Sequence, residues 1–76
     1  MNNNRRKEIK KIIKQIKIIQ SQIEDVRDDE QDYYDDIPEN LQESKYHDIS
    51  ESAIENLDLA VETIEELINN LSESAV

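Results

Sequence analysis

The feature that most restricts the fold of this chain is the regular spacing of its apolar residues. Across residues 9–37 they recur after alternating steps of three and four, and Glu30 occupies the one step without an apolar side chain. The members of this stripe are Ile9, Ile12, Ile16, Ile19, Ile23, Val26, Tyr33 and Ile37. Such spacing keeps side chains on one face of an α-helix for about four heptads, as in a coiled coil. It predicts a helix over residues 4–36, with Asn4 as its N-cap.

A second stripe with the same spacing occupies the C-terminal third of the chain. Asp48 and Glu51 have the spacing of a capping box, which predicts that a helix starts there and continues to about residue 72. The stripe consists of Ile54, Leu57, Val61, Ile64, Ile68, Leu71 and Ala75, and a row of Ala53, Ala60 and Leu67 runs beside it. This broad apolar face is typical of a helix in a bundle.

Residues 37–47 are expected to connect the two helices. They contain the only proline, Pro38, which disfavours helical geometry at Ile37 and should end the first helix. Because proline fits the first turn of a helix, a single turn over residues 38–42 can follow. His47 is expected to be an exposed loop residue. The residues expected to form an apolar plug at this end of the hairpin are Tyr33, Tyr34, Ile37, Leu41 and Tyr46.

Two long helices with a short connection predict a single all-α domain over residues 1–76, folded as an antiparallel helical hairpin. Two helices alone cannot cover stripes this wide, so we expect a homodimer that forms a four-helix bundle. The predicted self-assembly core consists of Ile9, Ile12, Ile16, Ile19, Ile23 and Val26 with Ile54, Leu57, Val61, Ile64, Ile68 and Leu71.

Charge is distributed very unevenly along the chain. Residues 1–20 hold seven Lys/Arg and one Glu, whereas residues 21–76 hold two Lys/Arg and eighteen Asp/Glu, and the net charge is −10. The antiparallel hairpin should lay the basic segment beside the acidic end of the second helix. Direct binding of nucleic acid is not expected, because phosphate contacts need a cationic surface. A basic or nucleic-acid-binding protein is a more suitable partner.

Several classes of function conflict with the composition. The chain has no glycine for a phosphate-binding loop and no cysteine for disulfides or thiol chemistry. It has no apolar run long enough to span a bilayer and no secretory signal, so we expect a cytoplasmic protein without membrane contact. The basic amphipathic segment at residues 5–17 could lie on an anionic membrane, but the acidic region that follows opposes this. No catalytic set can be assembled, so we expect neither enzymatic activity nor a cofactor.

The acidic cluster at residues 25–36 leaves several functions open. It can be a solvated face, a docking surface for a basic protein, or a mimic of the DNA backbone. A calcium loop would need a glycine that is absent, and a bundle metal site around Glu30 would need a Glu-x-x-His motif, whereas His47 follows Glu43 by four. Ile18 and Leu59 interrupt the polar outer faces and could be contact residues. The candidate partner-binding residues are Asp28, Asp29, Asp32, Asp35, Tyr34, Ile18 and Leu59.

Residues 30–44, E-x-D-Y-Y-D-D-I-P-E-N-L-Q-E-S, followed by Ala53-Ile54-Glu55-Asn56-Leu57, resemble small acidic helical-hairpin proteins of phages, prophages and their low-GC bacterial hosts. The resemblance covers about the C-terminal two-thirds of the chain and implies no established activity. It suggests a phage or prophage protein, located in the bacterial host's cytoplasm, that binds or inhibits a host or phage protein. The expected function is therefore protein–protein interaction, with DNA mimicry and a carboxylate metal site as alternatives.

Overall fold

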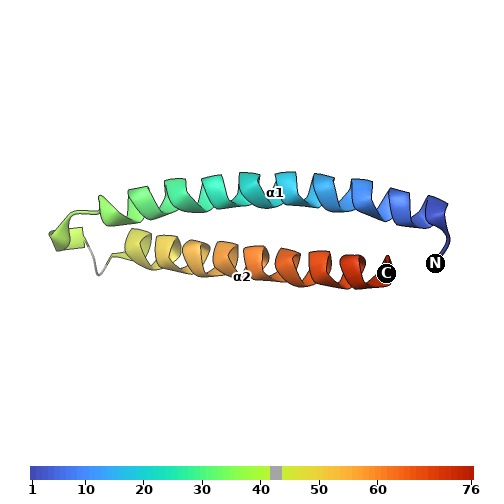
Figure 1. Cartoon of the computed structure of the whole chain (residues 1–76). Coiled ribbons are helices and arrows are strands. Elements are labelled where there is room, and N and C mark those ends of the chain that lie inside the picture. The colour runs from blue at the N-terminus through green and yellow to red at the C-terminus, as the bar shows by residue number, and fades with distance from the viewer. Residues whose placement is uncertain (42–43) are drawn as a thin grey trace.

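The computed structural model describes residues 1–41 and 44–76, which form two α-helices lying side by side (Figure 1). Helix α1 spans Asn3–Asp35, helix α2 spans Lys45–Ser74, and a short 3-10 helix at Glu39–Leu41 lies between them. Both chain termini lie at the end of the molecule opposite the connection (Figure 1). The predicted all-α antiparallel hairpin is confirmed, and the described residues contain no strand.

Helix α1 begins and ends where local chemistry permits. Asn2, and not the predicted Asn4, is the N-cap, because its Oδ1 accepts a hydrogen bond from the Arg5 amide at 2.8 Å. The last turn closes with the Asp36 amide donating to the Asp32 carbonyl at 3.1 Å. The helix stops two residues before Ile37-Pro38, as the steric restriction before proline predicts.

Helix α2 begins one turn earlier than the sequence analysis predicted. Ser44 is the N-cap in place of Asp48, and its hydroxyl accepts a hydrogen bond from the His47 amide at 3.4 Å. Asp48 instead lies in the first turn, where its carboxylate interacts favourably with the helix dipole. The predicted turn at residues 38–42 is observed as the 3-10 helix at Glu39–Leu41, and residue 42 lies outside the described residues.

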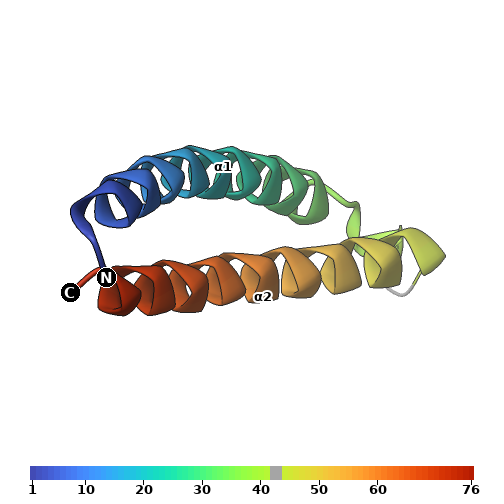
Figure 2. The same cartoon turned by 90° about the vertical axis from the view of Figure 1, so that its right-hand side faces the viewer.

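The hairpin is long and thin. Its principal extents are 60 × 15 × 12 Å and its radius of gyration is 17.4 Å, whereas a compact domain of this length would have a radius of about 11 Å. Figure 2 shows α1 arching over the straighter α2. Among the described residues no hydrophobic side chain is fully buried, and only Ser50 is, with 1% exposed. The described residues of the two helices therefore meet along a line of contact and do not surround a three-dimensional core.

We call this line of contact the seam; its residues are half-buried, apart from fully buried Ser50. All six residues of α2 that were predicted to lie in the core are half-buried, as expected. On α1, however, Ile12, Ile19 and Val26 are 38%, 49% and 56% exposed, so a single hairpin does not bury them and their place in a self-assembly core stays a prediction. The seam residues are Ile9, Ile13, Ile16, Gln20, Ile23, Arg27, Glu30 and Tyr34 on α1, and His47, Ser50, Ile54, Leu57, Val61, Ile64, Ile68 and Leu71 on α2.

Polar partners on α2 explain why Ile12, Ile19 and Val26 stay exposed in the hairpin. Gln20 and Arg27 both reach across the seam: Gln20 Nε2 donates to the Val61 carbonyl at 3.5 Å, and Arg27 Nε donates to Asp58 Oδ1 at 2.8 Å. The helix is thereby rotated so that Ile13, Gln20, Arg27 and Tyr34 face α2. Ile12, Ile19 and Val26 consequently lie beside the seam.

Candidate functional site

Helix α1 carries a row of exposed apolar side chains along one side of the seam. Ile12, Ile19, Val26 and Tyr33 recur every seven residues and are 38%, 49%, 56% and 51% exposed. A seven-residue repeat places side chains nearly above one another along a helix. Each residue of the row lies three positions after a seam residue. The row therefore extends from Ile12 to Tyr33, along about two-thirds of α1.

Helix α2 has a matching row in the equivalent position. Ala53, Ala60 and Leu67 lie three positions after the seam residues Ser50, Leu57 and Ile64, and Tyr46 continues their seven-residue repeat toward the connection. Because an antiparallel pair has an approximate twofold relation between its helices, equivalent positions fall on the same side of the seam. The two rows therefore form one surface, which we call the apolar face. On α2 it consists of Tyr46, Ala53, Ala60 and Leu67, with Tyr46 67% and Leu67 43% exposed.

The opposite side of the seam, which we call the polar face, is charged. Arg27 and Asp58 make an ion pair across it at 2.8 Å, with Arg27 also 3.5 Å from Asp28. The hydrogen bond that Arg27 donates to Asp58 raises the pKa of Arg27 above its usual value, and desolvation opposes this rise. The remaining positions beside the seam on this face are Lys10, Lys17, Glu24 and Gln31 on α1, and Glu51, Glu65 and Ser72 on α2.

The apolar face ends in a pocket at the connection. Tyr33, Ile37, Leu41 and Tyr46 line this pocket together with Pro38. The predicted apolar plug is thus present for these four residues, but it is not closed, since Leu41 is 45% exposed and Tyr33 and Tyr46 more than half. The pocket extends the apolar surface to the end of the hairpin.

Tyr34 lies in the seam and not on the surface. Its ring packs against the ring of His47, with ring centroids 4.6 Å apart. The structure corrects the expectation for His47, which is a half-buried residue of α2 and not an exposed loop residue. Tyr34 is half-buried, and its predicted contact with a partner stays a prediction. Desolvation raises the pKa of Tyr34, and the negative charges of Glu51, Asp35 and Asp48 add to this rise.

One group of side chains in the described part of the chain has the spacing of metal ligands. His47, Asp48 and Glu51 each offer one ligand atom, and these three atoms lie within 4.8 Å of one another. Asp48 and Glu51 are exposed. His47 Nδ1 is 3.8 Å from Asp48 Oδ1 and 4.0 Å from Glu51 Oε2. Two exposed carboxylates within two turns are common on acidic helices. Glu30 is half-buried in the seam and is not part of this group.

The predicted acidic and apolar surface residues lie on the outside of the helices. The four aspartates of the candidate set are exposed: Asp28, Asp29, Asp32 and Asp35. Ile18 and Leu59 are 61% and 58% exposed, as expected. Each of these two lies opposite the seam of its own helix, so they belong to opposite outer surfaces and do not form one patch.

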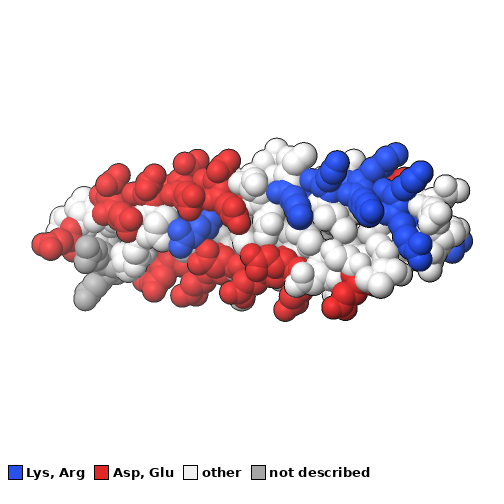
Figure 3. Space-filling model, viewed as in Figure 1, with Lys and Arg blue, Asp and Glu red and all other residues white. Residues whose placement is uncertain are grey.

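Charge separates the two ends of the hairpin. We define the loop end as residues 24–58 and the open end as residues 1–23 and 59–76. The loop end has fourteen Asp/Glu and two Lys/Arg, whereas the open end has five Asp/Glu and seven Lys/Arg. Figure 3 shows carboxylates over both helices at the loop end and Lys/Arg gathered on α1 at the open end. Net charges are −12 and +2.

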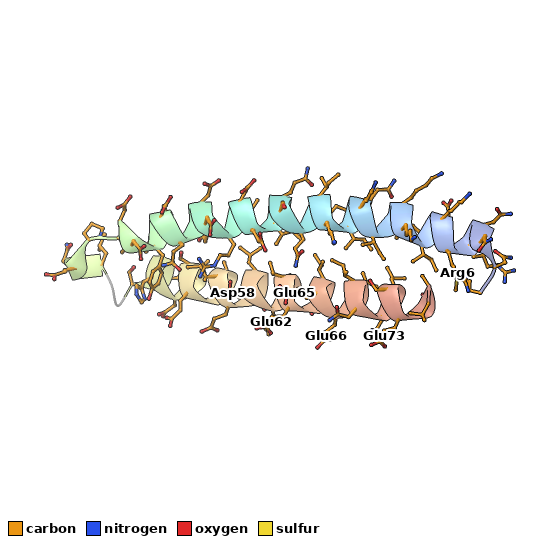
Figure 4. The ribbon with its side chains drawn as sticks, in the orientation of Figure 1. Arg6, Asp58, Glu62, Glu65, Glu66 and Glu73 are labelled. Atoms are coloured by element: carbon orange, nitrogen blue, oxygen red, sulfur yellow. The ribbon has the colours of Figure 1, made fainter. Side chains whose placement is uncertain are left out.

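Few of these charges pair directly. The basic segment of α1 lies beside the C-terminal half of α2, as the antiparallel arrangement predicts (Figure 3). Figure 4 shows three glutamates spaced along α2, Glu62, Glu66 and Glu73, and Arg6 near the N-terminal end of α1. Within residues 1–41 and 44–76, however, the ion pairs between the helices reduce to Arg27 with Asp58. The charge distribution therefore acts mainly through long-range fields.

Comparisons with protein-family models, with curated proteins and with solved structures found no match to this chain. Neither α1 nor α2 combines the length and apolar character that a membrane-spanning helix needs. Function is therefore inferred from the structure, and the most distinctive surface of the structure is the apolar face.

Proposed function

We propose that this chain is a non-enzymatic protein–protein interaction module that acts through its apolar face. The observation that carries the proposal is the row of exposed apolar side chains from Ile12 to Tyr33 on α1, beside which α2 places exposed Tyr46 and Leu67 and half-buried Ala53 and Ala60. Large contiguous apolar surfaces on soluble proteins mark binding sites. The opposite side of the same hairpin carries charged groups, so the two sides have different roles.

The seven-residue repeat of the rows indicates which kind of partner surface can pack against the apolar face. Side chains that recur every seven residues pack best against another helix at a small crossing angle. The chemistry of the partner is therefore a helical surface with its own apolar stripe. The resemblance to phage and prophage proteins supports a host or phage protein in the bacterial cytoplasm as one such partner.

Adjacent residues on α1 provide a matched test of this proposal. Ile19 lies in the apolar face with 49% exposed, and Ile18 lies on the outer surface with 61% exposed. We expect Ile19→Asp to weaken association, or binding of the hydrophobic dye ANS to a monomer, by about tenfold or more, because the face loses a central contact. Ile18→Asp should leave both unchanged. Light scattering measures association, and circular dichroism verifies that both variants stay helical.

The proposal fails if the two variants behave alike in both assays. Equal association and equal dye binding would mean that the apolar face has no special role. Because both substitutions add one carboxylate at neighbouring, similarly exposed positions, net charge and helix propensity do not distinguish them. Any difference between them therefore reports on the face itself.

A second candidate function rests on the acidic loop end. The carboxylates there cover both helices and point outward (Figure 3), as a mimic of the DNA backbone requires. This function predicts that the chain displaces duplex DNA from a lysine-rich, non-specific DNA-binding protein. Neutralising Asp28, Asp29, Asp32 and Asp35 to asparagine should abolish that displacement and preserve helicity. Retained displacement would refute it.

A further inference from the structure

We infer that the apolar face is occupied by a second copy of this chain, docked end for end so that the two connections lie at opposite ends of a four-helix bundle. This inference rests on the proposed function and specifies its first partner. Three independent observations support it: the exposed area, the positions of the apolar rows, and the charges of the two ends.

The exposed area matches a missing interface. The chain exposes 5973 Å², whereas a compact monomer of 8.9 kDa would expose about 4,800 Å². The excess is therefore roughly 1,200 Å², and a stable protein interface buries about 800 Å² on each partner. A second copy that covers the apolar face would remove an area of this size.

The midpoint of the α1 row lies at the level of Ala60 on α2. On α1 the midpoint falls between Ile19 and Val26, and on α2 Ala60 is the middle one of Ala53, Ala60 and Leu67, with Tyr46 one repeat further toward the connection. The hydrogen bond from Gln20 to the Val61 carbonyl, at 3.5 Å, holds these two levels side by side. A twofold axis that crosses the helices at this level therefore places each row on the same row of the second copy.

The side chains that this axis brings together are complementary in size. Ala60 meets Ala60 of the second copy, where two methyl groups allow the α2 helices to approach closely. Leu67 meets Ala53 of the second copy, a large side chain against a small one. On the α1 side, Ile19 meets Val26 of the second copy.

Charge selects this orientation over the other twofold arrangement. An axis parallel to the helices would also cover the apolar face, but it would place the two loop ends, each with a net charge of −12, side by side. The end-for-end arrangement places each loop end beside the open end of the second copy, which has a net charge of +2. Repulsion between the loop ends therefore disfavours the parallel axis.

The absence of cysteine from the chain allows a direct test by cross-linking. Ala60→Cys places one thiol at the proposed axis, so a copper–phenanthroline oxidant should convert most of the protein to a disulfide-linked dimer. Asn40→Cys, near the tip of the connection, should not cross-link, because the two tips would lie at opposite ends of a molecule about 60 Å long. Leu59→Cys, on the outer surface one residue from Ala60, is the matched control.

Each outcome of this experiment has a defined meaning. A dimer by light scattering, with efficient cross-linking of Ala60→Cys alone, supports the inference. Cross-linking of Asn40→Cys without Ala60→Cys would show a dimer with both connections at one end and would overturn it. Equal cross-linking of Leu59→Cys and Ala60→Cys, or a monomer at every concentration, would also overturn it. The comparison of Ile19→Asp with Ile18→Asp would still decide separately whether the face binds another protein.

Discussion

At the scale of single residues, Ser50 is the most unusual position in the hairpin. It is 1% exposed, and its hydroxyl has no hydrogen-bond partner among the described residues. A buried hydroxyl without a partner lowers stability, because it loses its hydrogen bonds to water. The seam at this point therefore carries an energetic defect beside the His47–Tyr34 contact.

Replacing this hydroxyl should stabilise the protein. We expect Ser50→Ala to raise the free energy of unfolding by about 1 kcal/mol, since it removes the unpaired group at little loss of packing. Ser52→Ala, two residues away and exposed, is the control and should change stability by less than about 0.5 kcal/mol. Urea denaturation monitored by circular dichroism measures both. A loss of stability in Ser50→Ala would indicate that the hydroxyl has a partner.

Tyr34 provides a prediction about pH. Its pKa in the folded protein is raised above the usual 10.0, mainly by desolvation. The neutral phenol is thus favoured in the folded state, and this contribution to stability is complete below pH 10.0 and is lost as pH rises through the folded pKa. We expect the melting temperature to fall in this alkaline range.

The variant Tyr34→Phe isolates this effect. It retains the ring that packs on His47 but cannot ionise, so its melting temperature should fall less at alkaline pH than that of the original chain. Tyrosinate absorbance followed during the titration should show that the difference between the two proteins arises at high pH. Identical pH profiles would contradict the assignment of Tyr34 to the seam.

At the scale of elements, the start of α2 is the clearest test of local structure. Ser44 caps the helix, so Ser44→Ala should lower the free energy of unfolding by about 1 kcal/mol. Asp48→Asn removes only a favourable interaction with the helix dipole and should cost about 0.5 kcal/mol. Denaturation curves compare the two. A larger loss of stability in Asp48→Asn than in Ser44→Ala would indicate that Asp48 is the N-cap, as the capping-box spacing predicted.

Helix α1 shows what a periodic pattern leaves undecided. Two stripes can be drawn along this helix, and both contain Ile9, Ile16 and Ile23. One is completed by Ile12, Ile19 and Val26, and the other by Ile13, Gln20 and Arg27. Apolar character favours the first set, which was therefore predicted to face α2. The second set forms the seam because Gln20 and Arg27 find hydrogen-bond acceptors on α2. The clue in the sequence is Ile13, an apolar residue beside the predicted stripe that makes the stripe wider than one neighbouring helix requires.

At the scale of the whole molecule, stability depends on the seam. Val61 is half-buried in it, whereas Leu59, two residues earlier, is 58% exposed on the outer surface. We expect Val61→Asp to lower the free energy of unfolding by about 2 kcal/mol or more, because a carboxylate must be desolvated between the helices. For a hairpin with little core this should abolish most helicity.

Leu59→Asp is the matched control for that substitution. It adds the same charge to the same helix, and its effect on helicity and melting temperature should be small. Circular dichroism and light scattering should be measured on both variants. A Val61→Asp protein with full helicity and unchanged mass would contradict both the seam and the assembly built on it.

The sequence by itself determined the two helices, the break at Pro38, the antiparallel hairpin and the concentration of acidic charge near the connection. These follow from local rules: apolar spacing, the geometry of proline and the short connection. Helical periodicity states which side chains share a face, but it does not state how far a helix is rotated toward its neighbour. That rotation depends on contacts between distant residues, such as Arg27 with Asp58 and Tyr34 with His47. Only the tertiary structure therefore decided that Tyr34 faces inward, that Ile19 faces outward, and that both apolar rows share one face.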